Sequence, residues 1–362
     1  MGAFFDPAAP DGTTPKNRFH SCRAARRVLL FHMDKIKFIN GIVLETGSGV
    51  VMGETTSARP DSPAEMPGIE GRGYKILEKR FLNDQNTVFE MVIEAPQLAG
   101  KARGGNFVMI RLHEQGERIP LTIGDYDRKK GTVTIAVLVV GKTTKEMSRL
   151  EAGETIYDLV GPLGKEAHTD QKFPGPVVIV GGGVGIAAVY PQAKELHQSG
   201  NHVISIIGAR NTKLLFWREK MKAVSSELVI TTDDGSEGKK GFVTDALREI
   251  IKTRKVSRII AIGPLIMMKM VAKLTSGVEG LPKVETWVSL NPIMIDGTGM
   301  CGGCRYFTSD HEMKYACVDG PDVDGHNVDF ENLMKRNSRF KAQEQESLHK
   351  YDSCRAAGPK GA

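Results

Sequence analysis

The stretch Asp296-Gly-Thr-Gly-Met-Cys301-Gly-Gly-Cys304, with Cys317 further along, organises the interpretation of the whole chain. Four residues separate Asp296 from Cys301, two separate Cys301 from Cys304, and twelve separate Cys304 from Cys317. The plant-type [2Fe–2S] spacing is C-x4-C-x2-C followed by a distant fourth Cys. This stretch fits it with Asp296 in place of the first Cys, and the glycines between the ligands allow the backbone to turn its N–H groups toward a cluster. The spacing therefore predicts a [2Fe–2S] site.

Other roles for these cysteines stay open on spacing alone. They fit a structural zinc site with Asp296, His311 or His326 as the fourth ligand. A redox pair is also open, although a C-x-x-C of that type is expected near a βαβ unit without a third Cys. Cysteines also occur as small buried apolar residues. Four potential ligands with glycines between them favour the iron–sulfur interpretation.

Composition limits the function classes. A length of 362 residues predicts two or three domains, and 40% hydrophobic and 25% charged residues are ordinary for a globular protein. The net charge is +6, and residues 1–33 contribute +3 of it. The near-balanced remainder predicts neither a nucleic-acid nor an anionic-membrane surface. An odd number of cysteines, with three close together, indicates a reducing compartment, so we expect a cytoplasmic protein. No apolar run reaches the roughly 18 residues of a membrane span.

Residues 1–72 differ from the rest of the sequence. They are rich in Gly, Pro, Ser, Thr and Ala and show little periodicity, so we expect disorder or a wrongly assigned start, with Met33 or Met66 as alternative first residues. Arg23, Arg26 and Arg27 resemble part of an organellar transit peptide, but no amphipathic helix follows them. Cys22 and Cys354 are expected to be unpaired.

Residues 73–170 read as an antiparallel β barrel. Alternation with a period near two predicts short strands at 74–81, 87–93, 106–112, 119–123 and 132–140. A Gly/Pro turn, Asp158-Leu-Val-Gly-Pro-Leu-Gly164, is expected to close the barrel.

Residues 171–291 alternate strands with helices, which predicts a five-stranded parallel sheet. The expected strands are 176–180, 202–207, 228–232, 258–262 and 284–290, and the expected helices are 186–199, 213–223, 242–253 and 265–274. Residues 292–345 are expected to form the small iron–sulfur domain, with a polar helix near 328–350 and a tail over 346–362.

Two glycine turns follow strands of the predicted parallel sheet. Gly181-Gly-Gly-Val184-Gly185 joins a strand to a helix, where bare N–H groups and the helix N-terminus bind a phosphate. It is GGGxG, not GxGxxG, and a plain packing turn is the alternative. Gly263-Pro264 follows another strand and opens the sheet edge where ligands bind. Met267 and Met268, which follow it, are expected in the helix core. These turns predict a dinucleotide site formed by Gly181, Gly182, Gly183, Val184, Gly185, Gly263 and Pro264.

Two motifs of the barrel offer groups that can bind an anion, and the first of them can also bond to a flavin ring. Arg118-Ile-Pro-Leu121-Thr122 offers a guanidinium for a diphosphate and a hydroxyl for a ring. Gly141-Lys142-Thr143-Thr144 opens a predicted helix and offers N–H groups and two hydroxyls to an anion. Alone, each motif is a weak signal, because an exposed Arg is usually only solvated and the second motif is more simply a plain N-cap.

Taken in their order along the chain, the barrel motifs, the two glycine turns and the ligand set resemble the ferredoxin–NADP reductase superfamily. The resemblance is to the branch with a C-terminal [2Fe–2S] domain. That branch includes the electron-transfer subunit of dihydroorotate dehydrogenase B. It also includes the small (alpha) subunit of NADH-dependent reduced-ferredoxin:NADP oxidoreductase, also called sulfide dehydrogenase. The resemblance covers about residues 74–345. Asp at the first ligand position and the sequence 325–336 favour the ferredoxin:NADP group, and the dihydroorotate type remains the alternative.

The resemblance implies a role for each motif. Arg118, Leu121 and Thr122 would contact FAD, and Gly141 to Thr144 would hold its pyrophosphate. Gly182, Gly183, Val184 and Gly263 would line the pyridine-nucleotide site. Asp296, Cys301, Cys304 and Cys317 would ligate the cluster. No catalytic nucleophile is expected, because the cofactors supply the redox chemistry.

The resemblance also implies partners, namely a larger flavin and [4Fe–4S] subunit and, through that complex, ferredoxin. Asp233 and Asp234 would repel a 2′-phosphate, which favours NAD(H) over NADP(H), although Arg210 could pair with one. A free-standing NAD(P)H:acceptor reductase and a zinc-binding interaction module are the competing hypotheses.

Overall fold

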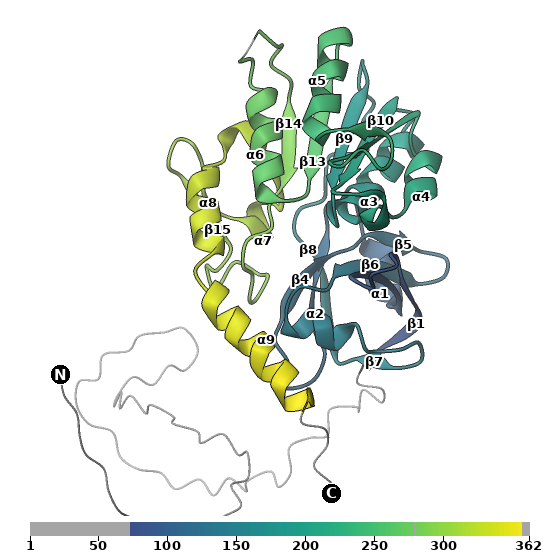
Figure 1. Cartoon of the computed structure of the whole chain (residues 1–362), viewed down its shortest axis with the longest axis vertical. Helices are drawn as coiled ribbons and strands as arrows, with labels where there is room; N and C mark the ends of the chain where they lie inside the picture. Colours follow the sequence, from purple (N-terminus) through teal and green to yellow (C-terminus); the bar gives the residue numbers. More distant parts are fainter. Residues whose placement is uncertain (1–72, 279, 357–362) are drawn as a thin grey trace, which may run out of the picture. The chain divides into compact units, whose positions relative to one another are not determined.

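The computed structural model describes residues 73–278 and 280–356, which belong to one compact unit (Figure 1). The predictions for residues 1–72, including Cys22, lie outside the described residues, and so does the side chain of Cys354. No helix in the described ranges combines the length and apolarity needed to cross a bilayer.

The barrel consists of two antiparallel sheets, as predicted. The larger has the order β5-β6-β2-β1-β7 and the smaller the order β4-β3-β8. Alternate side chains such as Phe89, Met91 and Ile135 are fully buried between them. The expected turn at 158–164 is mostly strand β8, because it pairs with β3. The elements are β1 (Tyr74–Phe81), β2 (Val88–Glu94), α1 (Pro96–Lys101), β3 (Phe107–Arg111), β4 (Ile119–Thr122), β5 (Asp125–Asp127), β6 (Thr132–Leu138), α2 (Lys142–Met147), β7 (Thr155–Ile156) and β8 (Asp158–Leu163).

The second sheet has the order β12-β11-β10-β9-β13-β14-β17. Its five predicted strands are present and parallel, and β12 and the antiparallel β17 extend it. On β9, Val178 and Val180 pack in the core with α5 and α6, whereas Val177 and Ile179 pack on the α3 side. The strands are β9 (Val177–Gly182), β10 (Val203–Ala209), β11 (Glu227–Thr232), β12 (Lys239–Lys240), β13 (Arg258–Ile262), β14 (Thr286–Ser289) and β17 (Asp322–Asp324).

The connecting helices cover both faces of this sheet (Figure 1). They are α3 (Gly185–Gln198), η1 (Thr212–Leu214), α4 (Arg218–Ala223), α5 (Val243–Thr253) and α6 (Leu265–Leu274). The single helix expected at 213–223 is divided into η1 and α4, because Trp217 adopts a left-handed conformation with φ 55°.

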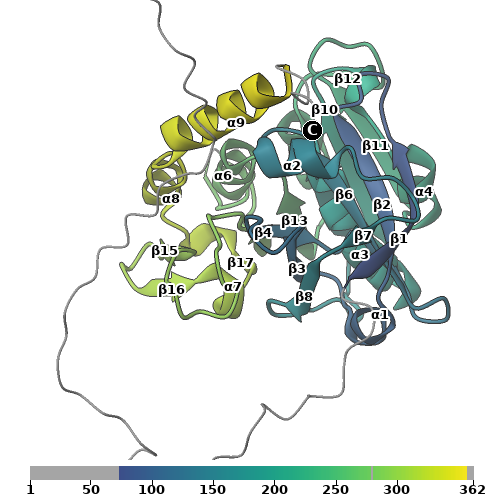
Figure 2. The same ribbon diagram turned by 90° about the horizontal axis from the view of Figure 1, so that it is seen from below.

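The C-terminal segment returns to the rest of the unit at two places. Its strand β17 pairs with β14, and its last helix packs on α2 of the barrel, where Lys145 Nζ lies 2.7 Å from Asp352 Oδ1. Figure 2 shows α9 beside α2, and α9 continues as helix through the expected tail to Ala356. The elements are β15 (Arg305–Phe307), β16 (Met313–Tyr315), α7 (Ala316–Asp319), η2 (Gly325–Asn327), α8 (Phe330–Asn337) and α9 (Lys341–Ala356).

Candidate cofactor-binding site

Three neighbouring parallel strands end at one edge of the second sheet. They are β9, β13 and β14, and each is followed by a predicted site segment. Gly183 to Gly185 follow β9, Gly263-Pro264 follows β13, and the ligand loop 296–304 comes shortly after β14. From β9 the chain proceeds outward on one side through β10, β11 and β12, and it then crosses back to add β13 on the other side of β9. The strand order therefore reverses at β9, and this is the switch point where open α/β sheets bind ligands.

The turn after β9 leaves its backbone open to a ligand. Gly183 has φ +55°, donates its N–H to the carbonyl of Gly208 at 2.9 Å, and a Cβ there would meet nothing within 4 Å. Gly185, in contrast, lies against Ile262 and Gly263, where a Cβ would be 2.7 Å from the Ile262 carbonyl carbon. The two glycine turns therefore pack tightly on each other while Gly183 stays accessible, which suits close approach of a phosphate.

Met267 and Met268 occupy different environments. Met268 is fully buried in the helix core, as expected. Met267 is partly buried and lies against Gly182 and Gly263 at the sheet edge. The sequence alone did not distinguish these two adjacent side chains.

The predicted flavin residues form one corner of the barrel. Arg118 precedes β4, and its guanidinium lies 3.8 Å from Asp158. The N-terminus of α2 has Gly141 as its N-cap, with open space around it. Thr144 is committed to the backbone, because its hydroxyl accepts from the N–H groups of Val140 and Gly141 at 3.0 Å.

Glu117 contacts the N-terminal residues of α2, and the sequence did not predict this contact. Its carboxylate accepts from the Thr143 hydroxyl at 2.5 Å and lies 3.8 Å from the Lys142 ammonium. Lys142 and Thr143, which were predicted to bind a pyrophosphate, therefore bind a carboxylate in the structure. Their chemistry suits an anion. Acidic residues are frequent near such motifs, so no sequence signal singled out Glu117.

The four predicted cluster ligands lie in two pairs. Cys304 and Cys317 are buried, and their sulfurs are 3.2 Å apart. Asp296 and the exposed Cys301 form the second pair, since the Asp296 carboxylate accepts the Cys301 N–H at 2.7 Å and also contacts the thiol. Cys301 Sγ in turn accepts from the N–H of Gly303 at 3.3 Å.

The two pairs differ in electrostatic environment. Burial raises the pKa of the Cys317 thiol to about 12, and the adjacent Cys304 adds to this rise. Burial alone would also raise the pKa of the Asp296 carboxyl. The N–H groups of Thr298 and Cys301 have the larger combined effect, and they lower this pKa below its usual value. Asp296 is therefore an ionised oxygen donor at neutral pH, whereas the buried Cys317 thiol needs a cation to release its proton.

The predicted ligands do not gather around a single metal position in the described part of the chain. Within residues 73–278 and 280–353, no three His, Cys, Asp or Glu side chains converge closely enough to hold a single metal ion. His326, one alternative fourth ligand, lies 3.0 Å from the Thr275 hydroxyl. Two ligand pairs are the arrangement expected for a two-iron cluster with two protein ligands on each iron.

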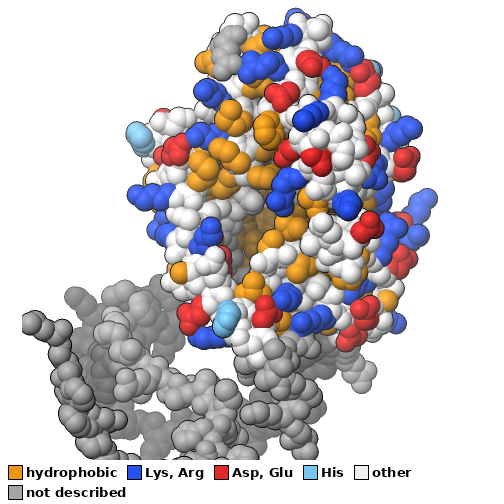
Figure 3. Space-filling view, viewed as in Figure 1, with side chains coloured by type: hydrophobic (Ala, Val, Ile, Leu, Met, Phe, Trp, Pro, Cys, Tyr) orange, Lys and Arg blue, Asp and Glu red, His pale blue; other side chains and the backbone are white. Residues whose placement is uncertain are grey.

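The ligand loop packs directly on the barrel. A Cβ on Gly297 would lie 2.8 Å from Met109 on β3 and from Leu163 on β8. Met109 pairs with Pro120 of β4, so only one strand separates the loop from the Arg118–Thr122 motif. In Figure 3, hydrophobic side chains surround a hollow on the face where Figure 1 shows α6, α7 and β8. The cluster ligands and the predicted flavin site therefore border the same region.

Phe242 is a further candidate residue that the sequence did not reveal as one. It was expected only as the start of a helix. It precedes α5 and is 63% exposed, and the adjacent Val243 packs on Gly208 at the end of β10. An exposed aromatic ring at the carboxyl edge of the sheet offers a stacking surface for a base.

Comparisons with known proteins agree with this architecture. Residues 179–273 match the model of the oxidoreductase NAD-binding domain, and residues 291–329 match the iron–sulfur cluster binding domain of dihydroorotate dehydrogenase B. The two matches fall on the two parts of the site described above.

Relatives align over most of their own length. A Thermotoga maritima homolog of the electron transfer subunit of dihydroorotate dehydrogenase B (NAD(+)) is 47% identical over 264 residues, which are 73% of this chain and 91% of the relative. The electron transfer subunit from Listeria monocytogenes serovar 1/2a is 31% identical, over 68% of this chain and 94% of its own. An uncharacterized Clostridium beijerinckii protein is 44% identical, over 79% and 100%.

A solved structure shows the same fold. A chain from the structure of an NADH-dependent reduced ferredoxin–NADP oxidoreductase is 42% identical, with a TM-score of 0.71, over 79% of this chain and 99% of its own. The resemblance seen in the sequence is thus confirmed, and this chain belongs to the family of oxidoreductase electron transfer subunits typified by that of dihydroorotate dehydrogenase B.

Proposed function

We propose that this chain passes electrons between NAD(H), FAD and a [2Fe–2S] cluster, as one subunit of a larger oxidoreductase. The observation that carries the proposal is the row of three adjacent parallel strands that end in the nucleotide turn, in Gly263-Pro264 and in the cluster loop. The loop also touches β3 and β8 of the barrel. Both matched domains and the similarity to electron transfer subunits support it.

Each group has a set of residues that suit it. Gly183 and the N-terminus of α3, together with Gly263, fit a dinucleotide pyrophosphate. Arg118, Lys142 and Thr143 fit the FAD pyrophosphate once Glu117 is displaced, and Leu121 and Thr122 would contact the flavin ring. Asp296 with Cys301, and Cys304 with Cys317, would each hold one iron. Hydride and single-electron transfer are the chemistry that the bound cofactors supply.

The chain's own contribution is positioning and the exclusion of water. The buried side chains around Cys304 and Cys317, among them Tyr306 and Ala316, keep water from one ligand pair. An oxygen ligand is harder than thiolate, so Asp296 would tune the potential of the iron it holds. Exposed Asp233 and Asp234 near the end of β11 disfavour a 2′-phosphate, so NAD(H) is the proposed nucleotide.

We propose a larger flavin and [4Fe–4S] subunit as the partner, with ferredoxin reached through the complex. The ligand loop has an apolar border that suits docking, since Met300 is 89%, Ile295 56% and Val318 40% exposed. The similarity to dihydroorotate dehydrogenase B subunits supports a dihydroorotate-type complex as the second candidate. We place the protein in the cytoplasm, because the thiols of Cys301, Cys304 and Cys317 need a reducing compartment. The proposed domain limits are 73–170, 171–291 and 292–345.

Cofactor analysis of the anaerobically purified chain tests the proposal. The expected content is two irons, two acid-labile sulfides and one FAD per chain. Zinc in place of iron, or the absence of both iron and flavin, would contradict it. Separate KM values for NADH and NADPH test the nucleotide, and size-exclusion chromatography with a candidate large subunit tests the partner.

A further inference from the structure

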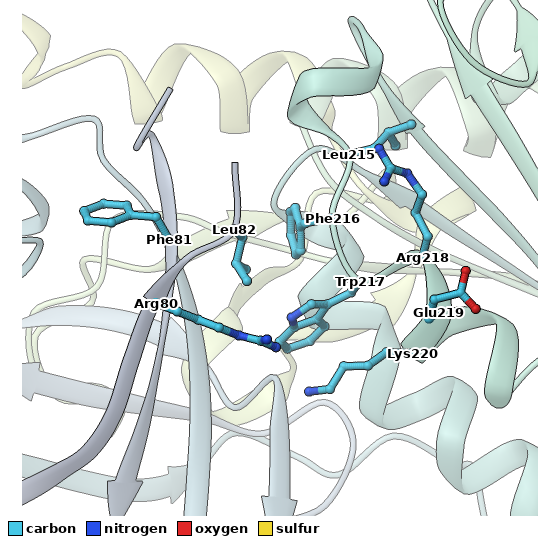
Figure 4. A pocket seen from close by; sticks show the side chains of 9 residues that line it. All are labelled: Arg80, Phe81, Leu82, Leu215, Phe216, Trp217, Arg218, Glu219 and Lys220. Atoms are coloured by element: carbon cyan, nitrogen blue, oxygen red, sulfur yellow. The ribbon is translucent and has the colours of Figure 1, made fainter. Parts of the chain in front are cut away.

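A groove of about 390 Å³ lies between the end of β1 and the segment that leads into α4 (Figure 4). Arg80, Phe81 and Leu82 line it from the barrel, and residues 215–220 line it from the nucleotide-binding part. Figure 4 shows Arg80 reaching from the barrel to the indole of Trp217, with Lys220 also beside that ring. None of these residues belongs to the proposed cofactor site.

Trp217 has an unusual backbone at this groove. Its φ of 55° and ψ of 26° are left-handed, which is a genuine outlier for a bulky side chain. Such a conformation persists only where the surroundings determine it, and it often marks a functional position. Trp217 is 7% exposed, and its ring packs edge-on against Tyr190 and Phe216, with centroid distances of 5.4 and 5.8 Å.

The indole N–H of Trp217 forms a hydrogen bond with the barrel. Its indole N–H donates to Glu90 Oε2 at 2.7 Å, and Glu90 lies on β2 with only 6% exposure. The other carboxylate oxygen of Glu90 accepts from Arg80 Nε at 2.5 Å. One buried carboxylate is therefore shared between a barrel donor and a donor from the nucleotide-binding part. Removing the indole N–H would leave Oε2 buried without its partner, which is costly.

A second set of polar contacts also joins the barrel to the nucleotide-binding part. Asp125 on β5 accepts from Lys194 of α3 at 2.8 Å and lies 3.4 Å from Lys220 of α4. The Lys220 ammonium also lies 4.0 Å from the centre of the Trp217 ring. A Cβ on Gly124 would be 3.2 Å from the same ring. Trp217 is therefore fixed between β2, the residue that precedes β5, α3 and α4.

We propose that Trp217 is a positioning residue whose hydrogen bond to Glu90 sets the angle between the barrel and the parallel sheet. This inference rests on the proposed function, in which the barrel holds the flavin and the sheet edge holds the nicotinamide nucleotide. Hydride transfer requires the reacting atoms at about 3–3.5 Å, and a displacement of 1 Å costs about a hundredfold in rate. A contact that fixes the angle therefore controls hydride transfer. Electron flow from the flavin to the cluster should depend less on it, because the cluster loop packs on the barrel itself.

The test compares variants of the purified cofactor-loaded protein by stopped-flow measurement of flavin reduction by NADH. Trp217→Phe retains a ring but lacks the N–H, and the expected result is a reduction rate at least tenfold lower. Glu90→Ala should be equally slow, and the double variant no slower than either single one. Glu90→Gln retains an acceptor for the indole, so most of the rate should return. Trp287→Phe is the matched control, since its indole bonds to Glu285 within the nucleotide-binding part.

Two further readouts separate positioning from mere stability. Photoreduction of the flavin, without NADH, should give the wild-type rate of cluster reduction in Trp217→Phe. Flavin content and midpoint potential should also stay unchanged. Equal NADH-driven rates in Trp217→Phe and the wild type, or an equal loss in both half-reactions, would overturn the inference. A wild type that NADH does not bleach at all would instead refute the proposed function.

Discussion

Replacing Gly185 by alanine tests the packing of the two glycine turns. A Cβ at this position would lie 2.7 Å from the carbonyl carbon of Ile262 and 2.9 Å from Cα of Gly263, and closer still to the Ile262 oxygen. Ordinary Cβ contacts begin at 3.4 Å, so the start of α3 must move more than 0.7 Å away from β13, because the Ile262 oxygen is closer than the carbon. The obstructing atoms are backbone and cannot rotate away.

The size of the effect follows from two opposed terms. Overpacking costs about 1–3 kcal/mol, and the upper end applies because backbone must shift. Alanine in a helix recovers about 1 kcal/mol relative to glycine. The free energy of unfolding should therefore fall by about 2 kcal/mol, which lowers Tm by roughly 4–8 °C. Displacement of the Gly183 turn should also raise the KM for NADH about tenfold or more.

Gly100→Ala is the matched control for this variant. Gly100 lies in helix α1, and a Cβ there would meet nothing within 4 Å, so the same substitution should raise Tm slightly. Calorimetry and steady-state kinetics on both variants provide the comparison. If Gly185→Ala melts no lower than Gly100→Ala and binds NADH as well as the wild type does, the packing argument is wrong.

Three more predictions concern other parts of the molecule. Asp296→Cys should retain the cluster and shift its midpoint potential, and an unchanged redox titration would count against Asp296 as a ligand. Phe242→Ala should raise the KM for NADH about tenfold, because base–aromatic stacking contributes about 1–3 kcal/mol; an equal KM would remove Phe242 from the nucleotide site. Burial raises the pKa values of Tyr126, Tyr190 and Tyr306 to about 12 from 10.0, so the stability they provide is complete below pH 10 and is lost as pH rises toward 12. Denaturant titrations across that range should show the loss, and Tyr306→Phe should reduce it; a pH-independent free energy of unfolding would refute this assignment.

The sequence predicted the fold where the pattern is local. Strand β1 and helix α6 have the expected limits, because alternation and helical periodicity are properties of single segments. Gly263-Pro264 was also placed correctly after its strand, but the turn expected at 181–185 is shorter, because Gly181 and Gly182 belong to β9 and Gly185 begins α3. Strand β17 was missed, since Asp322-Val-Asp324 is short and polar and becomes a strand only by pairing with β14.

The arrangement of the site was harder to predict, because it depends on contacts between segments that are distant in the sequence. The spacing of Asp296, Cys301, Cys304 and Cys317 identified a ligand set, but their division into two pairs depends on how the chain returns at α7. The binding of Glu117 to the α2 corner and the left-handed Trp217 depend on contacts between distant segments. Tertiary contacts of this kind leave no periodic trace in one sequence.

Anaerobic mixing of the purified chain with NADH, followed by absorption and electron paramagnetic resonance, tests the central claim most directly. We predict that NADH bleaches the flavin absorbance and that the signal of a reduced [2Fe–2S] centre appears in the same sample. Flavin that bleaches without any such signal, in a protein that contains iron, would contradict the proposed path from the nucleotide to the pairs Asp296–Cys301 and Cys304–Cys317.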